Sequence, residues 1–308
     1  MLKLRGCGTA IVTPFLADGS LDEKALRALV SWQIESGIDF LVPCGTTGET
    51  PTLTHEEWRR VIEITVETAA GRVPIVAGAT SNCTADAVAK ASEAAGIKGV
   101  DALLSASPYY NKPTQEGQFQ HFKAVAEAAK IPVVVYNVPG RTGVNVEPAT
   151  LVRLAALPNV IAVKEASGNI TQIGEICGLL HPNTPTTGAL GTPPPLFTVL
   201  SGDDALTLPV IAVGGHGVIS VASNAFPREM TELTRAALDN DWTRARQLHH
   251  KYLPLMQANF IESNPMPIKA VLAMQGRIQE NYRLPMCKMQ PSLRAKLESI
   301  ARAAGVVK

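Results

Sequence analysis

The chain has 308 residues, of which 46% are apolar and 18% charged, a composition that can bury a large core and is not that of a disordered protein. Its formal net charge of +1 gives no electrostatic basis for binding nucleic acid or an anionic membrane surface. The five cysteines are scattered and contain no Cys-x-x-Cys pair, which argues against a disulfide framework or a zinc site. No signal peptide or membrane-spanning run is visible, so we expect a soluble cytoplasmic protein.

Eight short apolar runs alternate with helical patterns along roughly the first three quarters of the chain. The runs are Thr9–Val12, Phe40–Val42, Pro74–Ala77, Ala102–Leu104, Pro132–Tyr136, Val160–Val163, Leu196–Leu200 and Gly217–Val221. They are continuously apolar, as is typical of parallel strands that are buried on both faces. The pattern favours an α/β fold of the (β/α)8 TIM-barrel type, with a doubly wound open sheet as the structural rival. No Gly-x-Gly-x-x-Gly motif follows the first run, which weighs against the dinucleotide-binding version of that rival.

Two of the helical patterns are preceded by residues typical of a helix N-terminus. Ser20–Glu23 and Thr54–Glu57 have the Ser/Thr-x-x-Glu spacing that predicts a capping box at a helix N-terminus. After Val221 only helical patterns follow, so we predict a catalytic barrel over residues 1–235 and a small α-helical C-terminal domain over residues 236–308. The Pro/Gly/Thr-rich segment 181–195 precedes the seventh strand and would therefore lie at the amino-terminal end of the barrel strands. Active sites of such barrels lie at the opposite end, so we expect this segment to have no catalytic role.

Lys164 closes the sixth apolar run and is the first candidate for chemistry. A lysine is costly to bury without a partner, so a lysine at the end of a buried strand needs a physical reason. It could be paired with Glu165 or another carboxylate. Alternatively, a desolvated lysine has a lowered pKa, and its neutral amine can attack a carbonyl group.

Other candidates follow the ends of other predicted strands. Tyr136 could relay protons or be a core aromatic, and Arg141 could grip a carboxylate or be solvated. The Gly45–Glu49 turn could cradle an anion with backbone N–H groups and two threonine hydroxyls, or be an ordinary tight turn. The adjacent Tyr109 and Tyr110 indicate a binding or interface loop, or simple surface packing. Their occurrence at the carboxyl ends of several strands favours one shared active site.

A set of longer motifs makes a family resemblance specific. In chain order these are Gly45–Glu49, Ser107–Asn111, Tyr136–Gly143, Val163–Ala166, Leu200–Asp204, Gly215–Ser220, Asn264–Lys269 and Leu284–Met286. With these motifs the chain resembles the dihydrodipicolinate synthase family, which belongs to the N-acetylneuraminate lyase superfamily of class I pyruvate-dependent aldolases. The resemblance covers essentially the whole chain.

The resemblance implies a Schiff-base-forming lyase that condenses pyruvate with L-aspartate 4-semialdehyde in the biosynthesis of diaminopimelate and lysine. It implies that Lys164 forms the Schiff base and that Thr46, Tyr136 and Tyr110 form a proton relay. In this family the tyrosine at the position of Tyr110 reaches into the site of a neighbouring subunit, so the resemblance implies a homo-oligomer, commonly a dimer of dimers. It implies no metal and no organic cofactor.

The same resemblance assigns the substrate contacts. Thr46 and Thr47 would hold the carboxylate of pyruvate, Gly202 and Ile219 would line the pocket, and Arg141 would bind the carboxylate of the semialdehyde. The family's allosteric lysine site maps onto Thr50, Pro51, His55, Trp58, Asn82, Asp86 and Tyr109. Because Asp86 stands where a glutamate is usual in lysine-sensitive members, the resemblance leaves inhibition by L-lysine open.

Two alternative functions remain at this stage. The first is a related pyruvate-dependent aldolase that cleaves sialic acid or a 2-keto-3-deoxy sugar acid, although the Arg-Thr-Gly pattern at Arg141 suits a short acidic aldehyde better. The second is a catalytically inactive barrel that serves as a binding or regulatory subunit.

Overall fold

The computed structural model describes residues 2–181 and 197–308. Most of the segment 181–195, for which no catalytic role is predicted, therefore lies outside the described residues. The strands are β1 (Gly6–Ala10), β2 (Phe40–Val42), β3 (Val76–Gly78), β4 (Ala102–Ala106), β5 (Val133–Asn137), β6 (Val160–Glu165), β7 (Thr198–Ser201) and β8 (Gly217–Ser220). All eight predicted strands are present, with shifts of up to three residues at their ends.

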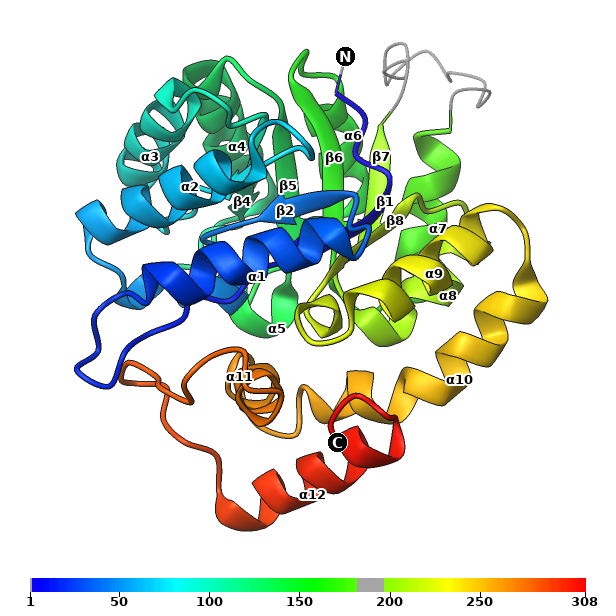
Figure 1. Cartoon of the computed structure of the whole chain (residues 1–308). Coiled ribbons are helices and arrows are strands. Elements are labelled where there is room, and N and C mark those ends of the chain that lie inside the picture. Colours follow the sequence, from blue (N-terminus) through cyan, green and yellow to red (C-terminus); the bar gives the residue numbers. More distant parts are fainter. Residues whose placement is uncertain (1, 182–196) are drawn as a thin grey trace. The chain divides into compact units, whose positions relative to one another are not determined.

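Helices follow the strands along the chain. They are α1 (Glu23–Glu35), α2 (His55–Ala69), α3 (Thr84–Gly96), α4 (Gln115–Ala129), α5 (Pro139–Thr142), α6 (Pro148–Ala155), α7 (Ile170–Leu179), α8 (Thr207–Ala212), α9 (Pro227–Leu238), α10 (Trp242–Ala258), α11 (Met266–Met274) and α12 (Pro291–Ala303). Short 3-10 helices are η1 (Thr46–Gly48), η2 (Thr50–Thr52), η3 (Asp204–Leu206) and η4 (Ala222–Asn224). Figure 1 shows this alternation of strands and helices along the chain. Within the described residues, no helix is both long and apolar enough to cross a membrane.

The strands form one parallel sheet with the order β2-β1-β8-β7-β6-β5-β4-β3. A parallel bridge between Leu41 of β2 and Ile75, directly before β3, links the two ends of that order. The sheet therefore closes almost completely, and the predicted (β/α)8 barrel with C-terminal helices is confirmed. Every residue of β4, β5 and β6 is buried, as continuous apolar runs predict for strands covered on both faces.

The chain divides into two compact units that do not follow the predicted boundary at residue 235. The first comprises Met1–Arg5 and Val76–Val218, and the second comprises Gly6–Ile75 and Ile219–Lys308. In the first unit α3 packs beside α4, and the neighbouring strands β4, β5, β6 and β7 pair in parallel, with one shift of register between β5 and β6. The division of the protein into a barrel and a C-terminal domain stays a prediction.

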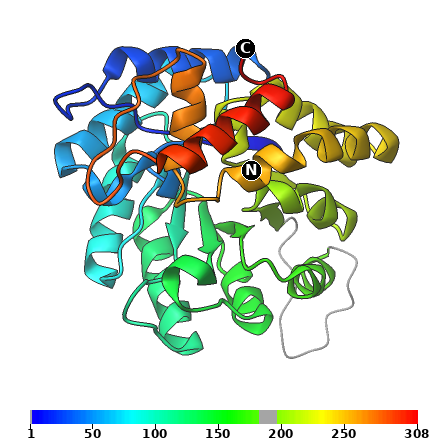
Figure 2. The same ribbon diagram turned by 90° about the horizontal axis from the view of Figure 1, so that it is seen from below.

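In the second unit, α1 packs against α2 and α9 packs against β1. The C-terminal helices add a layer in which α12 contacts both α10 and α11, as Figure 2 shows from below. The helical patterns predicted after Val221 correspond to α9, α10, α11 and α12.

The two predicted capping boxes have different outcomes. At α2 the Thr54 side chain accepts from the N–H of Glu57, and the Glu57 side chain accepts from the N–H of Thr54, so this prediction is confirmed. At α1 the prediction is wrong, because Asp22 caps the helix and the Ser20 hydroxyl donates to Asp18 instead. Asp and Ser are comparable N-cap residues, so local spacing alone could not decide between them.

Candidate active site

Lys164 and Tyr136 lie side by side on neighbouring strands of the first unit. The parallel register pairs Tyr136 of β5 with Lys164 of β6, so their side chains leave the sheet on the same face. The Lys164 ammonium nitrogen lies 4.3 Å from the centroid of the Tyr136 ring. Lys164 is 4% exposed and Tyr136 is 6% exposed. The structure therefore places an amine and a phenol together in a buried environment.

Glu165, the next residue on β6, points away from Lys164 because side chains alternate along a strand. Its carboxylate accepts from the Ser167 N–H at 2.7 Å, from the Asn137 amide at 3.0 Å and from the Gln172 amide at 3.4 Å. In the described part of the chain, no ion pair joins Lys164 to a carboxylate. The interpretation of Lys164 as half of a salt bridge with Glu165 is therefore wrong.

Gly202 follows β7 and packs closely against the Lys164 side chain. Its N–H donates to the carbonyl of Glu165 at 2.7 Å, which holds the two segments close together. A Cβ atom at Gly202 would lie 2.7 Å from the Cβ of Ala166 and 3.2 Å from the Cε of Lys164. Both distances are shorter than ordinary contacts, so the absence of a side chain at Gly202 is what lets Lys164 take its observed position.

Arg141 lies on α5, a single turn that directly follows β5, and it is exposed. The turn begins at Pro139, a residue pre-organised for the first helical position, and ends at Gly143 in the left-handed conformation. The Thr142 hydroxyl lies 3.2 Å from the carbonyl of Val138 and 2.9 Å from that of Val144, and it can donate its one proton to either. These contacts hold the segment that carries Arg141 in one conformation next to the Tyr136 strand.

Tyr109 and Tyr110 lie on the exposed loop between β4 and α4. Tyr110 is 88% exposed, and its backbone is in the left-handed region with φ of 75°. Tyr109 is 41% exposed. A tyrosine that exposes nearly all of its side chain contacts little of its own chain, so within the first unit Tyr110 is not buried together with Lys164 and Tyr136.

The Gly45–Glu49 turn belongs to the second unit and contains η1. The N–H groups of Gly48 and Glu49 donate to the carbonyls of Gly45 and Thr46, respectively, as a 3-10 turn requires. The prediction that successive N–H groups of this turn face an anion is therefore wrong for these two groups. Thr46 is half-buried and Thr47 is 2% exposed. The two threonine hydroxyls are groups of this turn that can bind an anion, whereas the N–H groups of Gly48 and Glu49 are already used within the turn.

Two residues that support this turn were given no role by the sequence. The Asn264 amide donates to the Thr47 hydroxyl at 3.0 Å, and the Lys269 ammonium forms an ion pair with Glu49 at 2.5 Å. Both belong to a motif that carried the resemblance, Asn264–Lys269, but nothing in the local sequence links them to residues more than 200 positions earlier. Ile219, also in the second unit, is fully buried on β8.

The residues predicted to bind L-lysine are distributed over both units. In the second unit, the His55 and Trp58 rings stack with their centroids 5.8 Å apart, and the Thr50 hydroxyl donates to the carbonyl of Gly45. Trp58 is 2% exposed, so its ring is mostly packed into the protein. In the first unit, Asn82 accepts through its backbone carbonyl from the amide of Asn111. The remaining residues Asp86 and Tyr109 are exposed, and Pro51 lies within η2.

Among the described residues, no group of three or more His, Cys, Asp or Glu side chains could hold a metal ion. His216 is instead part of the backbone pairing near β7, because its Nδ1 accepts from the Val199 N–H and its own N–H donates to the Val199 carbonyl. Burial is the largest cause that lowers the pKa of His216. The chemistry suggested by the first unit is therefore that of an amine beside a phenol.

Comparison with known proteins identifies the family. The model of the dihydrodipicolinate synthetase family matches residues 3–304. The chain belongs to this family. A 4-hydroxy-tetrahydrodipicolinate synthase of Koribacter versatilis is 67% identical over 307 residues, covering 100% of this chain and 98% of the relative. One of Acidobacterium capsulatum is 58% identical, covering 99% of this chain and 97% of the relative.

Solved structures of the dihydrodipicolinate synthetase family have the same fold. The chloride-inhibited dihydrodipicolinate synthase of Acinetobacter baumannii, complexed with pyruvate, has a TM-score of 0.91 and 40% identity, covering 99% of this chain and 100% of that one. The enzyme of Cyanidioschyzon merolae with lysine bound has a TM-score of 0.90 and 37% identity, covering 98% and 99%. The predicted family, the lyase class and the 4-hydroxy-tetrahydrodipicolinate synthase activity are confirmed by these relatives. The sugar-acid lyase and inactive-barrel alternatives are therefore set aside.

Proposed function

We propose that this enzyme performs the synthase reaction through a Schiff base between Lys164 and pyruvate. The observation that carries this proposal is the environment of Lys164. The amine is buried against the Tyr136 ring, has no carboxylate partner in the described part of the chain, and belongs to a side chain that packs against Gly202, where any Cβ atom would crowd it. A lysine amine that is not held in an ion pair can act as the nucleophile that attacks a carbonyl group.

The reaction has three stages. The Lys164 nitrogen attacks the keto carbon of pyruvate, and water leaves as the C=N bond forms. Loss of a proton from the pyruvate methyl group gives an enamine, whose carbon attacks the aldehyde carbon of L-aspartate 4-semialdehyde and forms the new C–C bond. The amino group of the semialdehyde then adds to the C=N carbon, closes the ring and displaces the amine of Lys164. The product is the cyclic precursor of diaminopimelate and lysine.

Tyr136 would carry protons to and from the reacting groups, since its ring lies 4.3 Å from the Lys164 nitrogen. Thr46 would pass protons between Tyr136 and Tyr110, and the exposure of Tyr110 suits a side chain that completes the relay in a second copy of the chain. Such a site requires a homo-oligomer, which we propose to be a dimer of dimers. A cytoplasmic location also stays a proposal.

Carboxylate recognition would fall to hydroxyl and guanidinium groups. Thr46 and Thr47 would bind the carboxylate of pyruvate, with Gly202 and Ile219 lining that pocket. Arg141, on the ordered turn after β5, would bind the carboxylate of the semialdehyde, since a guanidinium matches a carboxylate bidentately. Pyruvate as a ligand is supported by the complex of the Acinetobacter baumannii relative.

Inhibition by L-lysine is proposed for the residues around His55, Trp58 and Asn82. The lysine-bound relative from Cyanidioschyzon merolae supports such a site. A coupled assay with and without L-lysine tests it, and an undiminished rate at millimolar lysine would contradict it.

Borohydride trapping tests the Schiff base directly. The protein is incubated with pyruvate and sodium borohydride and then analysed by peptide mass spectrometry, with Lys164→Met as the control. We expect one covalent adduct, on Lys164, and loss of activity in proportion to labelling. Labelling of another lysine, or none, would contradict the proposal. Arg141→Ala is expected to raise the KM for the semialdehyde and to leave trapping by pyruvate intact.

A further inference from the structure

Thr47 is oriented by a side chain from the far end of the chain. The Asn264 amide nitrogen donates to the Thr47 Oγ1 at 3.0 Å, and both residues are at least 95% buried. A hydroxyl has one proton to donate, and an amide donor on its oxygen leaves that proton for another acceptor. Asn264 therefore directs the Thr47 hydroxyl to act as a donor, which is the role that binding a carboxylate requires.

Glu49, at the end of the same turn, is held by a second buried residue. Its φ of 53° lies in the left-handed region, which is unfavourable for a residue with a side chain. The Lys269 ammonium lies 2.5 Å from the Glu49 carboxylate and also donates to the carbonyl of Thr13 at 3.1 Å. The Thr13 hydroxyl in turn donates to the carbonyl of Gly48 at 2.7 Å. These contacts close a buried ring that fixes the turn from both sides.

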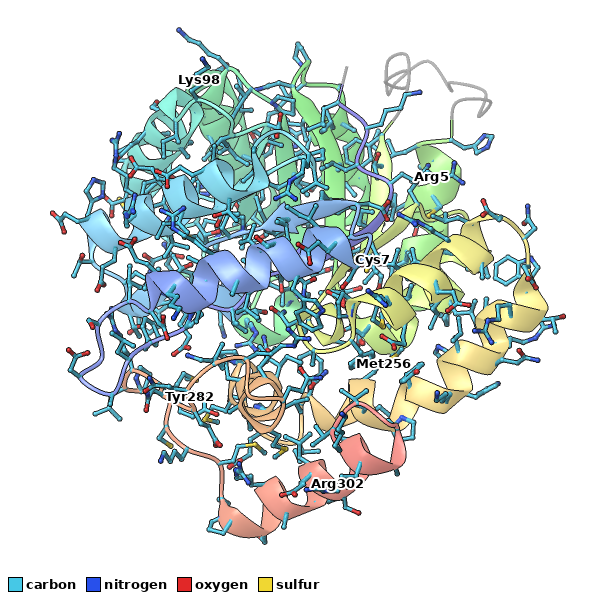
Figure 3. The ribbon with its side chains drawn as sticks, in the orientation of Figure 1. Arg5, Cys7, Lys98, Met256, Tyr282 and Arg302 are labelled. Carbon is cyan, nitrogen blue, oxygen red and sulfur yellow. The ribbon has the colours of Figure 1, made fainter. Side chains whose placement is uncertain are left out.

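Lys269 is 0% exposed and lies against aromatic rings. Its nitrogen is 4.4 Å from the centroid of the Phe15 ring and 5.1 Å from that of Tyr282, which Figure 3 labels in the C-terminal part of the chain. Burial lowers the pKa of Lys269, and the neighbouring Glu49 opposes that shift. With no exposed surface, the amine has no path to a substrate, so its role is to hold Glu49.

We propose that Asn264 and Lys269 are positioning residues that hold the Gly45–Glu49 turn in the conformation that binds the carboxylate of pyruvate, Asn264 through Thr47 and Lys269 through Glu49. This inference rests on the proposed role of Thr46 and Thr47 in the Schiff-base reaction. It predicts that loss of either residue weakens pyruvate binding selectively, although neither side chain touches pyruvate.

A double-mutant cycle tests the role of Asn264. We expect Asn264→Leu to raise the KM for pyruvate about tenfold, as for loss of one buried hydrogen bond, and the KM for the semialdehyde less than about twofold. In a Thr47→Val background, Asn264→Leu should have no further effect on the KM for pyruvate. Independent, multiplicative effects would overturn the proposal.

Asn259→Leu is the matched control. Asn259 is also fully buried, lies in the same segment, and has neither amide atom hydrogen-bonded among the described residues. Its substitution removes a buried amide without removing a bond to the turn, so the KM for pyruvate should be unchanged. An equal rise in KM for Asn259→Leu and Asn264→Leu would mean that the effect is one of general stability, and would overturn the proposal.

The Lys269 contact is tested with single and paired substitutions. Lys269→Met and Glu49→Gln are each expected to raise the KM for pyruvate, and the double variant, which removes both charges, carries the test if Lys269→Met does not fold. In every folded variant, borohydride should still trap pyruvate on Lys164 at saturating pyruvate. A folded double variant with an unchanged KM for pyruvate would overturn the proposed positioning role of Lys269.

Borohydride trapping in the unmodified protein distinguishes a failure of the positioning role from a failure of the proposed function. If pyruvate labels Lys164 but the KM for pyruvate does not respond to the Asn264 and Lys269 substitutions, the positioning role fails and the proposed function stands. If Lys164 is not labelled in the unmodified protein, the proposed function fails and the positioning role fails with it.

Discussion

Two lysines are buried among the described residues, and only one of them has a carboxylate partner. Lys269 is 0% exposed, and it is neutralised by Glu49 and bonded to the carbonyl of Thr13. Lys164 is 4% exposed and has only the Tyr136 ring within cation–π distance, with no carboxylate partner in the described residues. The ion pair and the carbonyl contact hold the Lys269 amine in place, whereas the Lys164 amine has no such partner and can bond to a substrate carbonyl. The difference between a structural and a reactive lysine is therefore the counter-charge and not the depth of burial.

Substitution of each lysine by methionine is the strongest test of this difference between Lys164 and Lys269. Lys164→Met should abolish turnover, by at least roughly 10⁴-fold in kcat, as expected for loss of a nucleophile. It should leave thermal stability equal or higher, because it removes a buried amine that lacks a counter-charge. Coupled-assay kinetics and calorimetry on one preparation measure both quantities. A large fall in stability would show that Lys164 has a structural partner.

Lys269→Met should instead lower the stability of the protein. It leaves the Glu49 carboxylate buried without its cation, which costs about 3–5 kcal/mol in unfolding free energy. Denaturant unfolding measures that cost, and Lys269→Met combined with Glu49→Gln should recover part of it. A loss below about 1 kcal/mol would mean that the pair contributes no more than an exposed salt bridge.

His121 tests whether burial without a counter-charge is enough to shift a titration. It is 2% exposed, its Nδ1 lies 3.0 Å from the Thr84 hydroxyl, and burial lowers its pKa to about 4. The unfolded chain, with a pKa near 6.5, binds this proton more readily than the folded one. Stability is therefore complete above about pH 6.5 and falls as the pH drops towards about 4, by up to about 3 kcal/mol.

The measurement for His121 is the unfolding free energy at a series of pH values, compared with His121→Gln. The variant cannot titrate at this position, so the curve of the unmodified protein should be steeper between about pH 4 and 6.5. Parallel curves would show that the pKa of His121 is the same in the folded and the unfolded chain, and would contradict the shift caused by burial.

Gly202→Ala sharpens the comparison at the reactive lysine. The added methyl would lie 3.2 Å from the Cε of Lys164 and 2.7 Å from the Cβ of Ala166, so neighbouring groups must shift. Overpacking of this kind costs about 1–3 kcal/mol, and we expect it to appear as slower Schiff-base formation, roughly 10- to 100-fold. Rates of borohydride-trapped labelling measure it. An unchanged rate would show that Lys164 does not require a residue without a side chain at position 202.

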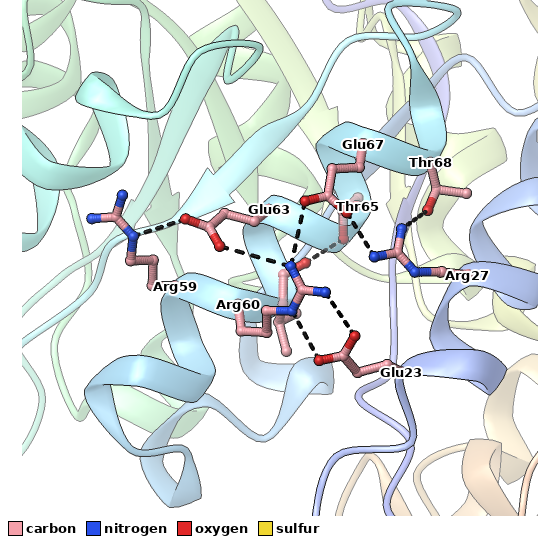
Figure 4. A network of polar contacts seen from close by, with 9 residues as sticks. Glu23, Arg27, Arg59, Arg60, Glu63, Thr65, Glu67 and Thr68 are labelled. Carbon is pink, nitrogen blue, oxygen red and sulfur yellow. Dashed lines mark hydrogen bonds and ion pairs between the residues drawn. The ribbon is translucent and has the colours of Figure 1, made fainter.

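Replacement of Arg60 should have the smallest effect on stability, because its ion pairs are exposed whereas the Lys269–Glu49 pair is buried. It lies among Glu23, Glu63 and Glu67 on α1 and α2, as Figure 4 shows, and its side chain is 36% exposed. Hydrogen bonds from Arg60 lower the pKa of Glu23. Because water screens these charges, Arg60→Ala should cost less than about 1 kcal/mol, and less still at high salt. A loss comparable with that of Lys269→Met would contradict the distinction between exposed and buried pairs.

The sequence by itself determined the parts of the protein that depend on local pattern. Continuous apolar runs identified the eight strands, because a strand that is buried on both faces carries apolar residues at nearly every position. Lys164 and Tyr136 could be found because polar residues at the ends of buried strands need a reason. Thr54 was recognised as a cap because its partner Glu57 lies only three residues away.

Only the tertiary structure decided which distant residues meet. Asn264 is 217 positions from Thr47, and Lys269 is 220 positions from Glu49. It also decided that Glu165 bonds to amides and not to Lys164, and that Asp22 rather than Ser20 caps α1. The physical reason is that hydrogen bonds and ion pairs depend on distances of about 3 Å, and a sequence specifies which groups exist but not which of them the fold brings that close.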